Sequence, residues 1–77
     1  MAASNGKIYP EKLVWRQTDG TIIACTEKNK VMQENLQEFT QTAQDLLEDA
    51  ILMGCNEGQV REVLEQIIRG LENPYQP

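Results

Sequence analysis

The feature that most constrains the fold is a long stretch, from Thr26 to Met53, that contains neither glycine nor proline. Those are the two residue types that most often end or break helices. Thr26 can cap the amino end of a helix, and Glu27 lies favourably at the positive end of the helix dipole. We therefore predict one helix over residues 27–53, about 40 Å long at ~1.5 Å per residue.

The apolar residues of this stretch follow a helical spacing. They recur at alternating steps of four and three residues, at Met32, Leu36, Phe39, Ala43, Leu46, Ala50 and Met53. An average spacing of 3.5 residues is typical of a seam along which one helix packs on another. Leu47 and Ile51 widen the stripe in its second half, whereas polar residues such as Gln33 and Thr40 flank the first half. We expect only the second half to be fully covered.

A second, shorter helix is predicted over residues 57–71. Gly54 suits the position just after the first helix, and Asn56 can cap the second one. The apolar residues of the second helix recur at alternating steps of three and one, at Val60, Val63, Leu64, Ile67, Ile68 and Leu71. This is the stripe of an amphipathic helix, and the sequence Asn73-Pro74 opposes its continuation. The short link between the two helices predicts antiparallel neighbours.

Residues 13–25 predict a β-hairpin. Asp19-Gly20 suits the positive φ angles of a two-residue type I′ turn, which places Trp15 opposite Ala24. In that register each face of the ribbon mixes apolar and polar side chains. Because an isolated two-stranded ribbon is marginal in water, we expect it to lie on a helix or to extend another sheet.

The two predicted helices differ in length. The second would be roughly 20 to 24 Å long at ~1.5 Å per residue, so it covers little more than half of the first. Met32, Leu36, Phe39 and Ala43 then need another cover, either the hairpin or a second polypeptide. The predicted fold is mainly α: one small domain over residues 1–77, an N-terminal β-hairpin followed by an antiparallel two-helix hairpin, dimerising into a four-helix arrangement. The ends, 1–6 and 73–77, are expected to be frayed.

Composition narrows the class of partner. Twelve Asp and Glu against seven Lys and Arg leave a formal charge of −5. This balance repels phosphate backbones and anionic lipid, so neither nucleic acid nor a membrane surface is expected to bind. The sequence shows neither the basic and apolar regions of a signal peptide nor an apolar run long enough to span a bilayer. We expect a soluble cytoplasmic protein in which Cys25 and Cys55 stay reduced.

The residue types required for most catalytic and metal sites are absent or badly spaced. The chain has no histidine, the commonest general base and metal ligand. Its two cysteines lie thirty positions apart and cannot complete a tetrahedral zinc site. Carboxylates are plentiful, but their spacing is typical of solvated helix faces. We therefore predict no catalytic residues, no metal and no cofactor, and a protein that is not an enzyme.

Part of the chain resembles a known association motif. Over residues 45–69, about a third of the chain, Leu46-Leu47, Ala50 and Gly54 followed by Val60-Arg61 and Leu64 look like the helical hairpin of bacterial Sin-type repressors and anti-repressors. The resemblance implies homo- or heterodimerisation through interlocked hairpins, with Leu46, Leu47, Ala50, Val60, Val63, Leu64 and Ile67 at the interface. The hairpin at 13–25 departs from that pattern, and no helix-turn-helix DNA reader is present.

These patterns predict a small interaction or regulatory protein that acts through its helical seam. The alternative is a small acidic chaperone or assembly subunit that shields a hydrophobic segment of a client. The residues expected to bind a partner are Met32, Leu36, Phe39, Ala43, Leu46, Leu47, Val60 and Leu64. The partner is a second copy of the chain, another protein, or both, because few charged positions flank the seam to select one.

Overall fold

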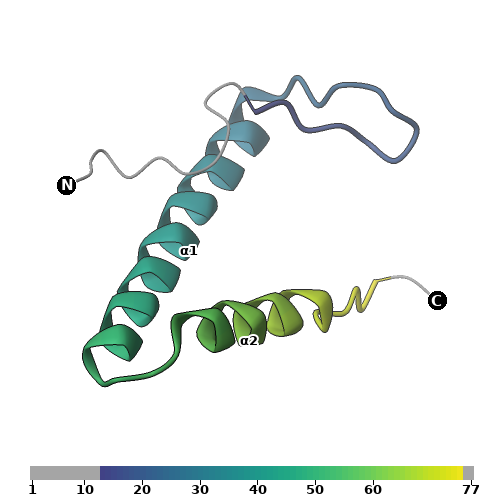
Figure 1. Ribbon diagram of the computed structural model, residues 1–77. Coiled ribbons are helices and arrows are strands. Elements are labelled where there is room, and N and C mark those ends of the chain that lie inside the picture. The colour runs from purple at the N-terminus through teal and green to yellow at the C-terminus, as the bar shows by residue number, and fades with distance from the viewer. Residues whose placement is uncertain (1–12, 76–77) are drawn as a thin grey trace. The chain divides into compact units, whose positions relative to one another are not determined.

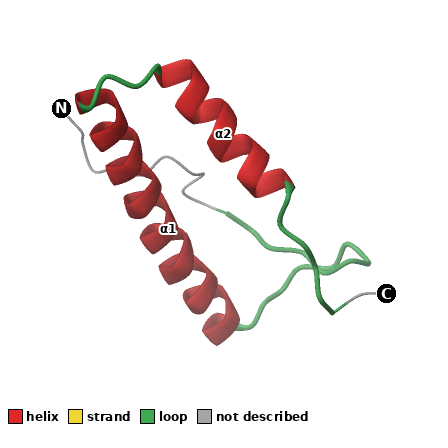
Figure 2. Cartoon of the chain, turned by 90° about the horizontal axis from the view of Figure 1, so that it is seen from below, coloured by secondary structure: helices red, strands yellow, loops and turns green. Residues whose placement is uncertain are grey.

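The computed structural model describes residues 13–75 and contains two helices, α1 (Thr26–Leu52) and α2 (Glu57–Arg69) (Figure 1). The mainly helical prediction is confirmed, and α2 turns back along the second half of α1 (Figure 2). Packing divides the chain into two compact units, Met1–Gln41 and Thr42–Pro77, which meet inside α1. The fraying predicted at residues 1–6 and at the last two positions lies outside the described residues.

In the first unit, the predicted hairpin is a turn closed by an isolated antiparallel bridge between Arg16 and Ile22, and the described residues form no strand. The Gly20 N–H donates to the Gln17 carbonyl at 2.9 Å, and the Gln17 N–H donates to the Thr21 carbonyl at 2.7 Å. Gly20 has a φ of +94°. These bonds close a three-residue connection with a left-handed glycine, not the predicted two-residue type I′ turn.

The longer connection shifts the pairing by one residue, so Trp15 lies opposite Ile23, not Ala24. The Ile23 N–H donates to the Trp15 carbonyl at 2.9 Å. Trp15 and Ile23 are both partly buried, whereas Val14 and Ile22 are more exposed, at 51% and 53%. A one-residue shift exchanges the faces of a ribbon. The apolar side chains that the predicted register scattered therefore include a half-buried pair on one face.

Side-chain hydrogen bonds stabilise the tip of this turn region and its junction with α1. The carboxylate of Asp19 accepts from the N–H of Thr21 at 3.0 Å and from its hydroxyl at 2.7 Å. These two bonds lower the pKa of Asp19 below its ordinary value. At the other end, the side-chain amide of Asn29 donates to the Ile23 carbonyl at 3.1 Å. Asn29 thereby joins the turn region to the first turn of α1.

Helix α1 begins one residue earlier than predicted. The Cys25 carbonyl accepts the N–H of Asn29 at 3.0 Å, so Cys25 occupies the capping position and Thr26 is the first helical residue. Thr26 therefore does not serve as the predicted cap. The helix ends at Leu52, one residue before the predicted end.

In the second unit, a glycine-based cap joins α1 to α2. Gly54 has a φ of +92°, its N–H donates to Ile51 at 3.0 Å, and the Cys55 N–H donates to Ala50 at 2.9 Å. This pair of bonds defines a Schellman motif, which commonly brings the residue after the glycine against the last turn of the helix. Gly54 therefore has the predicted position and supplies the backbone conformation that the link needs.

Helix α2 begins as predicted and ends early. The Asn56 side chain accepts the Gln59 N–H at 2.8 Å, which confirms the predicted cap. The helix stops at Arg69, two residues before the predicted end, and Gly70 caps it. Glycine is a poor helix former, and Asn73-Pro74 follows closely, so the last turn gains little from continuing. The apolar stripe therefore loses Leu71, which is 73% exposed.

The helical pair encloses very little. Ala50, 7% exposed, is the only buried residue among those that the structure describes. Leu47, Val60 and Leu64 are half-buried. Two helices present only one contact layer to each other, so most of each apolar stripe stays at the edge of the contact.

Candidate functional site: an apolar groove on the helical pair

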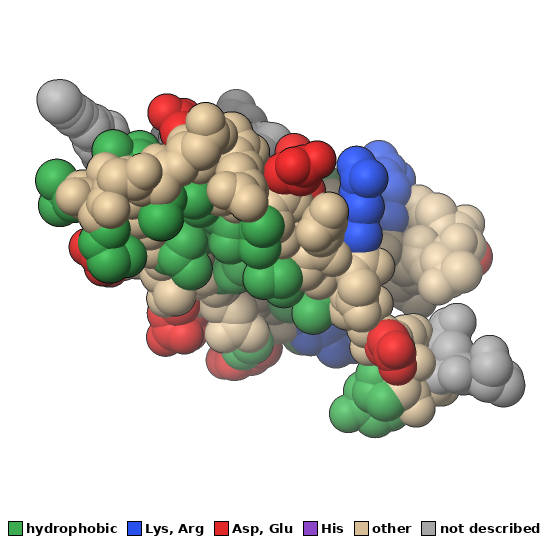
Figure 3. Space-filling view, turned by 60° about the horizontal axis from the view of Figure 1, so that its bottom comes forward, with side chains coloured by type: hydrophobic (Ala, Val, Ile, Leu, Met, Phe, Trp, Pro, Cys, Tyr) green, Lys and Arg blue, Asp and Glu red, His purple; other side chains and the backbone are tan. Residues whose placement is uncertain are grey.

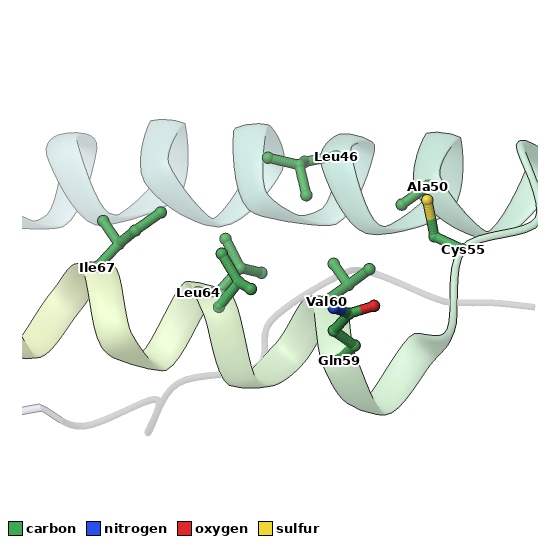
Figure 4. A pocket seen from close by; sticks show the side chains of 8 residues that line it. Leu46, Ala50, Cys55, Gln59, Val60, Leu64 and Ile67 are labelled. Atoms are coloured by element: carbon green, nitrogen blue, oxygen red, sulfur yellow. The ribbon is translucent and has the colours of Figure 1, made fainter.

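The second unit contains a groove between the end of α1 and α2 (Figure 4). Its volume is about 220 Å³, and eight residues line it: Leu46, Ala50, Cys55, Gln59, Val60, Val63, Leu64 and Ile67. All of these except Gln59 are apolar or, for cysteine, behave as small hydrophobes. The groove is therefore a site for apolar contact.

Helix periodicity explains how the groove forms. Leu46 and Ala50 lie four residues apart on α1, and Val60, Leu64 and Ile67 recur on α2 at steps of four and three. Residues at those spacings share one face of a helix. In Figure 4 these side chains extend from the two helices toward each other, and Cys55 lies beside Ala50 where the chain links the helices. The Schellman motif thus brings a sulfur-containing side chain to one end of the groove.

The contact between the helices leaves apolar side chains at both edges. On the groove side, Leu46 and Val63 are each 45% exposed and Ile67 is 57% exposed. Ile51 lies roughly 140° around α1 from Leu46, and Ile68 lies roughly 140° around α2 from Val63, so both belong to the opposite edge. They are 46% and 50% exposed. Leu46 and Ile51 have nearly the same exposed fraction and differ mainly in the edge they occupy, so Ile51 is a matched control for experiments on Leu46.

The structure brings only part of the predicted partner-binding set together. Leu46, Val60 and Leu64 line the groove. Ala43 and Leu47 are half-buried and do not line it. The remaining three predicted residues belong to the first unit, where Leu36 is half-buried, Met32 is 37% exposed and Phe39 is 55% exposed.

The predicted seam consists of two rows with different exposure. Leu36, Ala43 and Ala50, seven residues apart, are half-buried or buried. The other row also has a spacing of seven, and its members are 37%, 55%, 45% and 76% exposed: Met32, Phe39, Leu46 and Met53. Neither of the longer side chains that we expected to be fully covered in the second half, Leu46 and Met53, is buried. The apolar spacing identified the stripe but not its covered side.

Cys55 and Gln59 are the groove residues that sequence reasoning missed. Neither belongs to an apolar stripe, because Cys55 precedes the Asn56 cap and Gln59 is a polar residue in the first turn of α2. A residue that follows a predicted helix-ending glycine often packs on the preceding helix, so the spacing of Gly54 and Cys55 contained the missing signal.

The unit that holds the groove is strongly acidic. Residues 42–77 contain seven Asp and Glu, two Arg and no Lys, a formal −5, whereas residues 1–41 are neutral, with five of each sign. Arg61 donates to Glu57 at 2.9 Å, so one of the two arginines already pairs with a carboxylate. Figure 3 shows hydrophobic side chains gathered in a patch, with carboxylates at several places on its margin and Lys or Arg side chains at one end.

Other kinds of site were sought in the described part of the chain. Residues 13–75 contain no group of three or more His, Cys, Asp or Glu that could hold a metal ion. Neither α1 nor α2 combines the length and the apolar character that crossing a membrane requires. In comparisons with known proteins, no family model, no curated protein and no solved structure matched the chain.

Proposed function

We propose that this protein is a non-enzymatic interaction domain that binds another polypeptide through the groove of its helical pair. The observation that carries the proposal is the combination of an open apolar groove with a unit in which Ala50 alone, among the described residues, is buried. Leu46, Val63 and Ile67 are about half exposed. A partner that covers them would remove apolar surface from water, which stabilises the complex by about 25 cal/mol for each Å² buried.

The size of the groove favours side chains over a small-molecule ligand. Pockets for small ligands measure roughly 300 to 1,000 Å³ and bury most of the ligand. A groove of about 220 Å³ with half-exposed walls is smaller and more open than that. It suits one or two apolar side chains that project from a helix laid along it.

The sequence also supports association with another polypeptide. The resemblance over residues 45–69 to a helical-hairpin dimerisation motif supports the same kind of contact. Assembly into a multi-helix arrangement would cover the surface that two helices leave open. We propose that this association takes place in the cytoplasm.

Site-specific photo-crosslinking in cells tests the proposal. A photoreactive amino acid replaces Leu46 at the groove edge or, as the matched control, Ile51 at the opposite edge. We expect defined adducts, with any protein including a second copy, from position 46 and far fewer from position 51. Equal adducts at both positions, or none at either, would contradict a function of the groove in binding.

A further inference from the structure

We propose that the occupant of the groove is a basic amphipathic helix from another protein, with Lys or Arg beside an apolar stripe. This inference rests on the proposed function and specifies its partner class. The groove's dimensions, the charges along its edges and the charge of the whole unit each support it.

The dimensions suit one short helix. The groove follows α2, which has 13 residues and is about 20 Å long at ~1.5 Å per residue. Its lining residues from Gln59 to Ile67 extend over more than two turns. A helix that docks in such a groove presents apolar residues at positions i, i+3 or i+4, and i+7. The exposed walls, Leu46, Val63 and Ile67, are placed to contact a stripe of that spacing.

Acidic residues border the groove on both helices. At ~100° per residue, Asp49 lies roughly 60° around α1 from Leu46, on the side away from Ile51. By the same geometry Glu62 lies roughly 60° around α2 from Gln59 and roughly 100° from Val63, on the side away from Leu64, so it flanks the outer edge of the groove. A helix seated in the groove would therefore carry its flanking positions past a carboxylate on each side.

The two basic residues of the unit do not balance these carboxylates along the groove. Arg61 lies roughly 160° around α2 from Val63, toward the opposite edge, where it pairs with Glu57 at 2.9 Å. Arg69 stands in the last turn of α2, beyond the lining residues. The groove side of the helical pair thus favours positive charge in its occupant.

The same charges disfavour a second copy as the occupant. Docking two groove units would bring together two formal charges of −5, with no lysine in either unit to pair with the bordering carboxylates. Like charges that face each other across an interface weaken it and suppress the wrong partner. A basic helix gains from the field that a second copy would have to overcome.

Binding of designed peptides to the full 77-residue chain tests the occupant. The probe is a helix of Leu and Lys of about 14 residues, the length of α2, with Leu at the docking positions. A Leu–Glu peptide of the same pattern and a Leu–Lys peptide of scrambled order are the controls. We expect the patterned basic peptide to bind roughly tenfold or more tightly than either control and to weaken as salt rises.

Matched variants locate the binding. Val63→Glu should abolish binding of the basic peptide, whereas Ile68→Glu, of similar exposure on the opposite edge, should preserve it. Asp49→Lys with Glu62→Lys should remove the preference for the basic peptide. The same charge change at Glu48 and Glu65, away from the groove, should preserve the preference. Circular dichroism of every variant separates lost binding from lost folding.

The possible failures are distinguishable. If crosslinks form at position 46 but the acidic and basic peptides bind equally, the occupant is wrong and the proposed function stands. If the chain self-associates through position 46 and the basic peptide does not compete, a second copy occupies the groove and the inference is overturned. If neither peptide binds and no crosslink forms at position 46, both proposals fail.

Discussion

The two units of this chain are held in different ways. In the first, specific polar bonds define the local shape: Asp19 to Thr21, Gln17 to Thr21 and Asn29 to Ile23. In the second, one buried alanine and a set of half-exposed aliphatic side chains lie between two capped helices. The described part of the first unit buries no residue and also exposes apolar side chains, such as Val31 and Phe39. What distinguishes the second unit is the apolar groove between its two helices, which offers a partner a defined surface.

The two units also differ in formal net charge. The neutral first unit has no long-range electrostatic preference for a partner, while the second contains the whole formal charge of −5. Apolar surface and negative charge thus occur on the same few turns of helix. A partner chosen by both properties must be apolar on one face and basic at its borders.

The largest expected effect is at the centre of the helical contact. Ala50→Glu places a carboxylate where 7% of the residue is exposed, and should destabilise the second unit by roughly 3 kcal/mol or more. Leu52→Glu is the control, because Leu52 lies on the same helix and is 85% exposed; its effect should stay within about 0.5 kcal/mol. Urea unfolding followed by circular dichroism measures both. Similar losses for both variants would remove the distinction between centre and edge.

The two left-handed glycines compare the units directly. Gly20 has a φ of +94° and Gly54 of +92°, and neither has an atom within 4 Å of an added Cβ. Alanine at either position therefore costs backbone strain alone, roughly 1–2 kcal/mol. We expect Gly54→Ala to disturb resonances of both helices of the second unit in NMR spectra, and Gly20→Ala only those of residues 13–29. Changes that spread through both units in each variant would show that the units unfold together.

The capping residue of α2 should have a smaller effect. Asn56→Ala removes the acceptor of the Gln59 N–H and should destabilise the second unit by about 1 kcal/mol, and Asn56→Ser should restore most of the loss. Asn73 is a matched control, because its side chain also accepts a backbone N–H, from Tyr75 at 2.8 Å, but outside a helix. Thermal unfolding of the three variants compares them. An Asn73→Ala loss as large as that of Asn56→Ala would contradict the assignment.

The smallest effect concerns the pH dependence of the first unit. The bonds from Thr21 lower the pKa of Asp19 below its ordinary value of 3.8, so the turn is stabilised above that pH. The stabilisation should disappear as the pH falls through the lowered pKa, because the protonated carboxyl accepts these bonds poorly. NMR titration of the Thr21 amide should show loosening there while the Gln59 amide stays unchanged. Asp19→Asn should remove the acid transition, and a transition that persists in this variant would have another origin.

Sequence patterns predicted the local elements well. The absence of breakers predicted α1 to within one residue at each end, and Gly54 and Asn56 marked the link because each has a local role in the backbone. The turn at 13–25 was found, but its register was not, since Asp19-Gly20 is compatible with both connection lengths. The apolar stripes included most of the groove residues, and Cys55 and Gln59 were missed.

Packing between the helices decided which apolar side chains are buried and which are exposed. Periodicity places Leu46, Ala50 and Met53 on one stripe, and only the position of α2 makes one of them buried and the others exposed. Spacing along a single helix carries no information about which side its neighbour approaches, and a shift of one residue changes the exposed edge. The helices, their caps and the charge of this protein follow from the order of its residues, because they depend on neighbours along the chain. The groove depends on residues distant in the chain, so tertiary structure was needed to define it.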